Sequence, residues 1–154
     1  MIDTPDLRST HEQRTAVIRI TVPRSEIQTA MGPGYQELMD TLKAQGIQPA
    51  GPWFTHHLRM DPGVFDFELS VPVDVVVRPV GRVQPGSLPA SRVAHTVYHG
   101  PYEGLGEAWG AFEAWIAAQN LKPADDLWEV YSAGPETGPD PSTWRTDLFH
   151  PLAD

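Results

Sequence analysis

An ordered pattern that occurs twice is the feature of this sequence that most limits its possible folds. In the first half, residues 16–22 alternate apolar and polar side chains, and a helical pattern and two more alternating segments follow. The second half shows the same order after residues 74–89, a connector rich in proline and glycine. The pattern predicts two β-α-β-β halves, at about residues 16–73 and 90–152.

Three landmarks recur in the same order in both halves: a glycine-proline element at the helix, a tryptophan in the strand that follows the helix, and an aromatic-to-proline segment at the end. The pairs are 32–35 with 100–102, Trp53 with Trp128, and 65–72 with 144–151. The alternative is chance matching in a chain with 16 prolines and five tryptophans. We interpret the pattern as a duplication. It predicts an α+β fold with pseudo-two-fold symmetry, an antiparallel sheet with two helices on one face, and a groove between the halves.

Two amphipathic helices are predicted. The first is expected to begin at Gly32-Pro33 and to end at Gly46, because proline suits a first turn and glycine a helix end. The second follows Gly100-Pro101 and carries one apolar stripe at steps of three and four, formed by Tyr102, Leu105, Trp109, Phe112 and Ile116. Residues 1–15 are polar and aperiodic and are expected to form a flexible N-terminal tail, which leaves a single domain over residues 16–152.

Composition excludes several classes of function. The chain of 154 residues has no cysteine, which rules out disulfides and thiolate metal sites. Its net charge of −9 argues against direct binding to nucleic acid and slightly favours a cationic small molecule. There is no apolar signal segment and no long apolar run, so we expect a cytoplasmic protein that does not bind membranes.

The second half also carries a family likeness. Its elements are Val93-Ala94, His99-Gly100-Pro101-Tyr102, Trp115, Trp128-Glu129-Val130-Tyr131, Thr146-Asp147-Leu148 and Pro151. This order resembles the GyrI-like small-molecule-binding domain, which is the effector domain of AraC-type and MerR-type multidrug regulators and also occurs in free-standing gyrase-inhibitor-like proteins. The resemblance covers residues 16–152. Asp147 stands where many members of the family carry glutamate.

The resemblance implies that Glu129 lies in an aromatic groove and faces lipophilic cations, with Tyr131 and Trp144 in the walls. Strand alternation is compatible, because it places Glu129 and Tyr131 on one face with Leu127. A shielded carboxylate needs water, a partner or a cationic ligand. The alternative is an ordinary strand glutamate that faces solvent.

Other candidate residues have a structural alternative. His56 shares a strand face with Phe54 and could line the groove, or it could be a hydrogen-bonded core histidine. Glu68 shares a strand face with Asp66, and the two acids could form a second carboxylate site. The alternative is a pair on a solvated surface, as most such pairs are. The stripe residues Tyr102 and Trp109 could line a ligand cage or fill the core.

No cofactor or metal is expected. His56 and His57 are adjacent and would point to opposite faces of a strand, and His95 and His99 would lie about 13 Å apart. The chain has no dinucleotide fingerprint, no Walker sequence and no G-x-S-x-G element.

Two functions from different classes follow. The first is a stand-alone protein that sequesters or senses lipophilic, cationic aromatic small molecules. The alternative is a metal-independent hydrolase of electrophilic cyclopropane-containing compounds, as some free-standing members of the family are. There Glu129 would activate water and Tyr131 or His56 would donate a proton. A gyrase-inhibitor-like interaction module is a third reading. No helix-turn-helix fits before the first strand, so any contact with DNA would need a separate partner.

Overall fold

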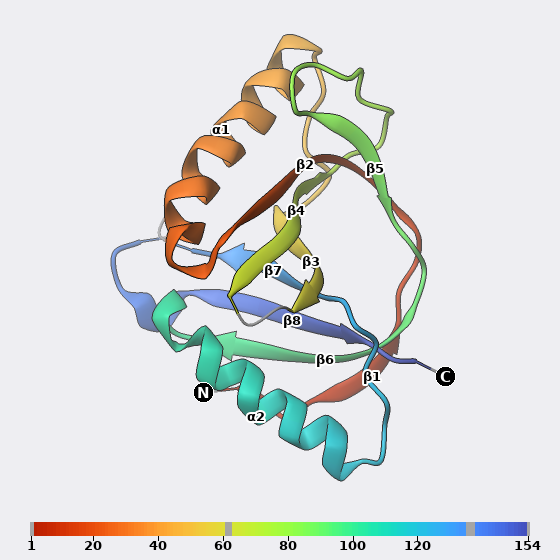
Figure 1. Cartoon of the computed structure of the whole chain (residues 1–154), viewed down its shortest axis with the longest axis vertical. Helices are drawn as coiled ribbons and strands as arrows, with labels where there is room; N and C mark the ends of the chain where they lie inside the picture. Colours follow the sequence, from red (N-terminus) through yellow and green to blue (C-terminus); the bar gives the residue numbers. More distant parts are fainter. Residues whose placement is uncertain (1, 61–62, 135–137, 154) are drawn as a thin grey trace. The chain divides into compact units, whose positions relative to one another are not determined.

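The computed structural model describes residues 2–60, 63–134 and 138–153 (Figure 1). The chain divides into two compact units. We call His11–Ala90 the middle unit, and Met1–Thr10 with Ser91–Asp154 the terminal unit. Each unit combines antiparallel strands with one α-helix, so the predicted α+β class is confirmed.

The middle unit has the strand order β3-β4-β2-β5, with every pair antiparallel. Alternating apolar residues of β2 and β4 pack with Leu38 and Leu42 of the helix into one core, because period two places them all on the same face. The elements are β2 (Gln13–Pro23), α1 (Ile27–Ala44), β3 (Phe54–Met60), β4 (Val64–Pro72) and β5 (Gln84–Leu88).

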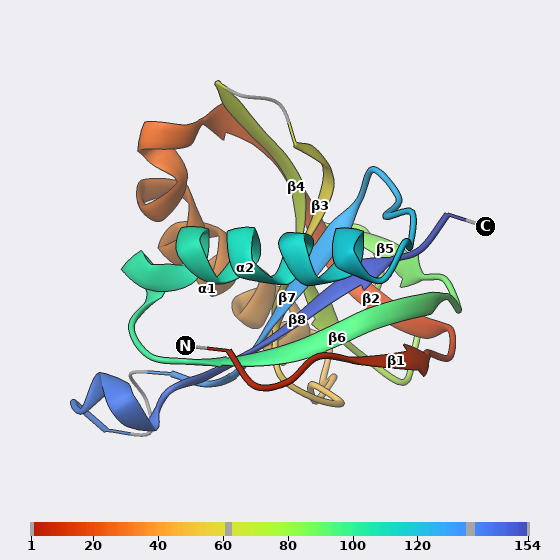
Figure 2. The same ribbon diagram turned by 90° about the horizontal axis from the view of Figure 1, so that it is seen from below.

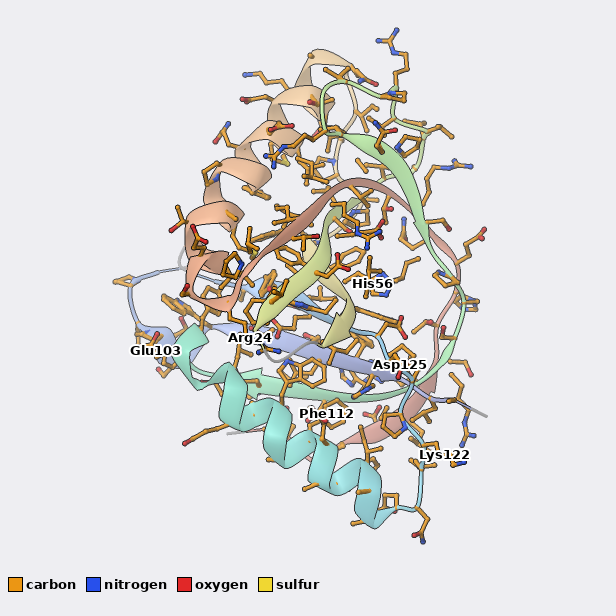
Figure 3. All side chains as sticks on the ribbon, viewed as in Figure 1. Arg24, His56, Glu103, Phe112, Lys122 and Asp125 are labelled. Atoms are coloured by element: carbon orange, nitrogen blue, oxygen red, sulfur yellow. The ribbon has the colours of Figure 1, made fainter. Side chains whose placement is uncertain are left out.

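The terminal unit has the strand order β1-β6-β8-β7, again antiparallel, and Figure 2 shows its helix lying across these strands. Phe112 and Ile116 of the helix are buried against Ala94 and Leu148, and Figure 3 labels Phe112 on that side of the helix. The elements are β1 (Asp6–Ser9), β6 (Arg92–His99), the 3-10 turn η2 (Tyr102–Gly104), α2 (Leu105–Ala118), β7 (Leu127–Ala133) and β8 (Arg145–Pro151).

Both units show the predicted β-α-β-β order, and each adds an edge strand that the sequence analysis missed. In the middle unit β2 lies between β4 and the edge strand β5. In the terminal unit β6 lies in the same way between β8 and the edge strand β1. The pseudo-two-fold symmetry and the groove between the halves stay predictions. None of the helices in the described residues is long and apolar enough to cross a membrane.

The edge strands correct two assignments. Residues 6–9, assigned to the flexible tail, form β1 and pair with β6, and the Nδ1 atom of His95 lies 3.6 Å from a carboxylate oxygen of Asp6. The segment assigned as a connector contains β5, and its Val77 and Val83 are buried in the core. Short edge strands are held mainly by backbone hydrogen bonds, so they need no alternating pattern in the sequence.

The helix start and one landmark pair are also corrected. α1 begins at Ile27, so Pro33 lies inside the helix, whereas Pro101 precedes η2. The two glycine-proline elements are therefore not equivalent. Trp53 lies before β3 and its ring contacts Tyr35 at 4.7 Å, whereas Trp128 lies within β7. The sequence Asp61-Pro62-Gly63 predicts a turn between the two strands that follow the first helix, and it falls in part outside the described residues.

Candidate functional site

Glu129 lies in the middle of β7 and points to the side of the strand that faces α2. Its neighbours on that side, Leu127 and Tyr131, are buried, and Leu127 belongs to the core beneath α2. On the opposite side, Trp128 stacks on Phe149 with ring centroids 5.5 Å apart. The alternation predicted for this strand therefore determines which residues Glu129 can contact.

Two neutral donors hold the Glu129 carboxylate. The indole N–H of Trp109 on α2 donates to Oε1 at 2.6 Å, and the hydroxyl of Tyr131 donates to Oε2 at 2.9 Å. Within the described part of the chain, no cationic side chain pairs with this carboxylate. Burial raises the pKa of Glu129, and the hydrogen bonds from Trp109 and Tyr131 oppose that rise. As far as the described residues show, the site thus presents an acid without a counter-charge.

Aromatic rings extend from this carboxylate. The ring of Tyr102 in η2 meets Tyr131 edge-on at 5.7 Å and lies 5.4 Å from the ring of Trp144. The indole N–H of Trp144 donates to the carbonyl of Gly138 at 3.1 Å, which fixes that ring. We call the residues gathered here the Glu129 cluster: Glu129, Trp109, Tyr131, Tyr102 and Trp144. An acid beside several aromatic faces can bind a delocalised cation by charge and by cation–π attraction.

Tyr98, which the sequence analysis did not single out, supports the turn that carries Tyr102. Its hydroxyl donates to the carbonyl of Pro101 at 2.7 Å. Gly100 has φ +142°, and a Cβ there would lie 2.8 Å from the Tyr98 hydroxyl. A Cβ on Gly104 would overlap the same hydroxyl. The glycines that frame this turn were the available signal, because the hydroxyl fills the space where their side chains would be.

The other predicted residues, Phe54, His56 and Glu68, lie in the middle unit. Phe54 and His56 are buried, and the Nδ1 atom of His56 lies 3.8 Å from Oε1 of Glu68. The carboxylate pair of Asp66 and Glu68 stays a prediction. The guanidinium of Arg19 forms an ion pair with Asp66 at 2.9 Å, so one of the two acids already has a cationic partner.

A polar network around the buried residues Asp147 and His95, on the opposite side of the terminal unit, was also missed. Asp147 accepts hydrogen bonds from His95 Nε2 at 2.8 Å, from the Ser132 hydroxyl at 2.8 Å and from Arg145 Nε at 3.0 Å. Burial would raise the pKa of Asp147, but these donors lower it well below its usual range. Ser132 and His95 both hydrogen-bond to Asp147 and not to each other. Activation of a serine nucleophile needs a hydrogen bond between the serine and its base, so this network is not such an arrangement.

Metal ligation has no geometric support in the ranges that the structure describes. No group of three or more histidine, aspartate or glutamate side chains there could hold an ion. The Glu129 cluster itself contains one carboxylate and no histidine, which does not suit a protein-bound transition metal.

Comparison with protein families gives a clear result. The model of the GyrI-like small molecule binding domain matches residues 4–153, nearly the whole chain. Comparison with curated proteins gives no match.

Solved structures share the fold. The C-terminal domain of EcmrR has a TM-score of 0.86 at 20% identity, covering 98% of this chain and 98% of that chain. In the EcmrR–DNA complex the TM-score is 0.84 at 22% identity, and the coverage is 98% of this chain but only 57% of that chain. SAV2435 bound to tetraphenylphosphonium gives 0.74 at 13% identity, with 98% and 94% coverage. A hydrolase from Listeria innocua gives 0.66 at 11% identity, with 97% and 91% coverage.

Proposed function

Because the chain belongs to the family of GyrI-like small-molecule binding domains, we propose that it binds lipophilic aromatic cations at the Glu129 cluster. The observation that carries this proposal concerns the Glu129 carboxylate: in the described part of the chain its hydrogen-bond donors are two neutral groups, the Trp109 indole and the Tyr131 hydroxyl. A permanent aromatic cation would supply the missing positive charge. The protein would sequester or sense such compounds, and we propose that it does so in the cytoplasm.

The cluster offers two kinds of attraction. A half-buried carboxylate attracts a cation more strongly than a surface carboxylate, because less water screens the pair. The rings of Tyr102, Tyr131 and Trp144 add cation–π and apolar contact, each worth about 0.5–2 kcal/mol according to desolvation. A compound that combines positive charge with aromatic groups uses both.

The comparisons support the ligand class by analogy. SAV2435, which shares the fold, has been solved with tetraphenylphosphonium, a lipophilic aromatic cation. EcmrR, which also shares the fold, has been solved in complex with DNA, but this chain spans 57% of that EcmrR chain. We propose no direct contact between this chain and nucleic acid, because its net charge of −9 opposes the approach of phosphates.

The alternative function is a hydrolase, and one contact favours it. Glu129 with a raised pKa beside the Tyr131 hydroxyl resembles a general acid or base poised near a proton relay. Turnover of an electrophilic cyclopropane-containing compound, abolished in Glu129→Gln, would establish this function. Stable binding of the same compound without consumption would contradict it.

The test of cation binding compares methyltriphenylphosphonium with neutral triphenylphosphine oxide by isothermal titration calorimetry. Glu129→Gln keeps the shape of the side chain and removes the charge, so it should weaken phosphonium binding about ten- to hundredfold and leave the neutral compound nearly unchanged. Glu113→Gln, on an exposed position of α2, is the matched control and should change neither. Equal losses for both compounds would indicate a packing effect, and no loss would place the site elsewhere.

A further inference from the structure

The polar contacts of Glu129 suggest that its charge changes with occupancy. We propose that the Glu129 cluster exchanges a proton for its ligand: Glu129 is a neutral carboxylic acid in the free protein and releases one proton when a lipophilic cation binds. This inference rests on the proposed function and adds regulation of the same site by pH.

The hydrogen bonds fit both protonation states. The indole N–H of Trp109 can only donate, so Oε1 of Glu129 must accept whether the group is charged or neutral. The Tyr131 hydroxyl can donate or accept. Oε2 can therefore carry the proton and donate it to the Tyr131 oxygen, and after deprotonation Oε2 accepts from the same hydroxyl. No side chain has to move.

Among the described residues of the terminal unit, no cationic side chain hydrogen-bonds or forms an ion pair with Glu129. The Tyr131 hydroxyl on its own strand donates to Glu129, and the ring of Tyr102 on η2 contacts the ring of Tyr131. From β8, the facing residue is Leu148, and His150 contacts the Trp109 ring at 5.8 Å. Tyr98 extends from β6, and the charged residues of α2 are Glu107 and Glu113, which are exposed and negative.

Burial acts in the same direction, because it raises the pKa of Glu129. The exchange also balances. The acid group loses one proton from Oε2 to the solvent, and the bound cation supplies one positive charge to the resulting carboxylate. The total charge of the cluster is then zero before and after binding, so the half-buried site never holds an uncompensated charge.

Proton release can be counted by calorimetry with tetraphenylphosphonium in buffers of different ionisation enthalpy, at several pH values from 5 to 8. At the lowest pH values, release should approach one proton per ligand. In that range the affinity for the cation should decrease up to about tenfold for each unit by which the pH is lowered. A glutamate at its ordinary pKa of 4.5 would release almost none above pH 6. Triphenylphosphine oxide should release no proton.

Variants assign the proton to a group. Glu129→Gln should bind the cation weakly without release, and His150→Gln should keep the release. Tyr131→Phe removes a donor that stabilises the carboxylate, so its release should extend to higher pH. Cation binding without release at any pH in the wild type would overturn proton exchange and leave the proposed function standing. No cation binding at all would overturn the proposed function, and release that persists in Glu129→Gln would overturn the assignment to Glu129.

Discussion

His57 shows how the burial of one side chain couples folding to pH. The residue is 4% exposed, its ring lies 5.4 Å from Phe65 and 5.2 Å from Phe67, and its Nδ1 atom has no hydrogen-bond partner among the described residues. Burial lowers its pKa from 6.5 to about 4, and the nearby charges of His56 and Arg24 act in the same direction. The folded protein therefore keeps His57 neutral at pH values where the unfolded chain protonates it.

The sign of the pH effect follows from this difference. Above pH 6.5 both states are neutral and the stability is complete, and between pH 6.5 and 4 the unfolded state gains a proton that the folded state does not. His57→Phe should remove this pH-dependent part of the stability. The wild type should therefore lose about 2 kcal/mol of unfolding free energy relative to the variant when the pH is lowered from 7.5 to 5. Urea unfolding at both pH values measures it. His11→Gln, at an exposed position, should show no such change, and a constant difference for His57→Phe would disprove the coupling.

Trp109 illustrates what periodicity could and could not predict at the level of single residues. The stripe placed it on the core side of α2, and it is 9% exposed there. The alternatives of core residue and site residue turn out to be compatible, because the ring is buried while its N–H reaches Glu129. Periodicity within one helix cannot reveal this bond, since the partner lies on a strand twenty residues later. Glu129 itself was found through the family resemblance, and the Asp147 network had no comparable signal.

The turn between β6 and α2 is the element on which the position of Tyr102 depends. Gly104→Ala would place a methyl group against the Tyr98 hydroxyl, which is already bonded to Pro101. We expect a loss of about 1–3 kcal/mol in stability, as for other overpacked sites, and weaker phosphonium binding because Tyr102 shifts. Gly106→Ala is the control: beyond its chain neighbours and the helix backbone, no described atom lies within 4 Å of the added Cβ, so the higher helix propensity of alanine should stabilise by about 0.5–1 kcal/mol. Thermal unfolding compares the two, and similar shifts in both would contradict the role of Tyr98.

Prediction of whole elements succeeded where side-chain patterns were strong. The stripe of α2 and the alternation around Glu129 in β7 gave their positions to within a few residues. α1 was placed too late because Pro33 was taken as a first-turn residue, although it lies inside the helix. β1 and β5 were missed because their sequences, DLRS and QPGSL, are short, polar and interrupted by proline or charge. Such sequences suit sheet edges, since they discourage pairing with another chain.

At the scale of the molecule, two units of the same topology differ in their chemistry. Glu129 pairs in register with Leu148, three residues before Pro151, and Thr55 pairs with Leu69, three residues before Pro72. The register position that Glu129 occupies in β7 is therefore occupied in β3 by Thr55, which is buried. The helices differ as well. α1 carries Gly34 where it approaches the sheet so closely that a Cβ would lie 2.8 Å from Leu69, whereas α2 packs on its strands with the rings of Trp109 and Phe112. The Glu129 cluster is therefore particular to one unit.

The net charge of −9 makes a prediction that belongs to the whole chain. An acidic molecule attracts cations from beyond contact distance, and salt screens this attraction with a Debye length of about 10 Å at 0.1 M. The affinity for tetraphenylphosphonium should fall roughly two- to tenfold between 20 and 300 mM sodium chloride, whereas triphenylphosphine oxide should bind no more weakly at high salt. Glu129→Gln removes only one of 20 acidic residues, so it should bind more weakly at every salt concentration and keep most of the salt dependence. Calorimetric titrations of both proteins measure the two effects separately. If the salt dependence disappeared in Glu129→Gln, the attraction would arise from that carboxylate alone, and the field of the remaining acidic residues would have no part in ligand capture.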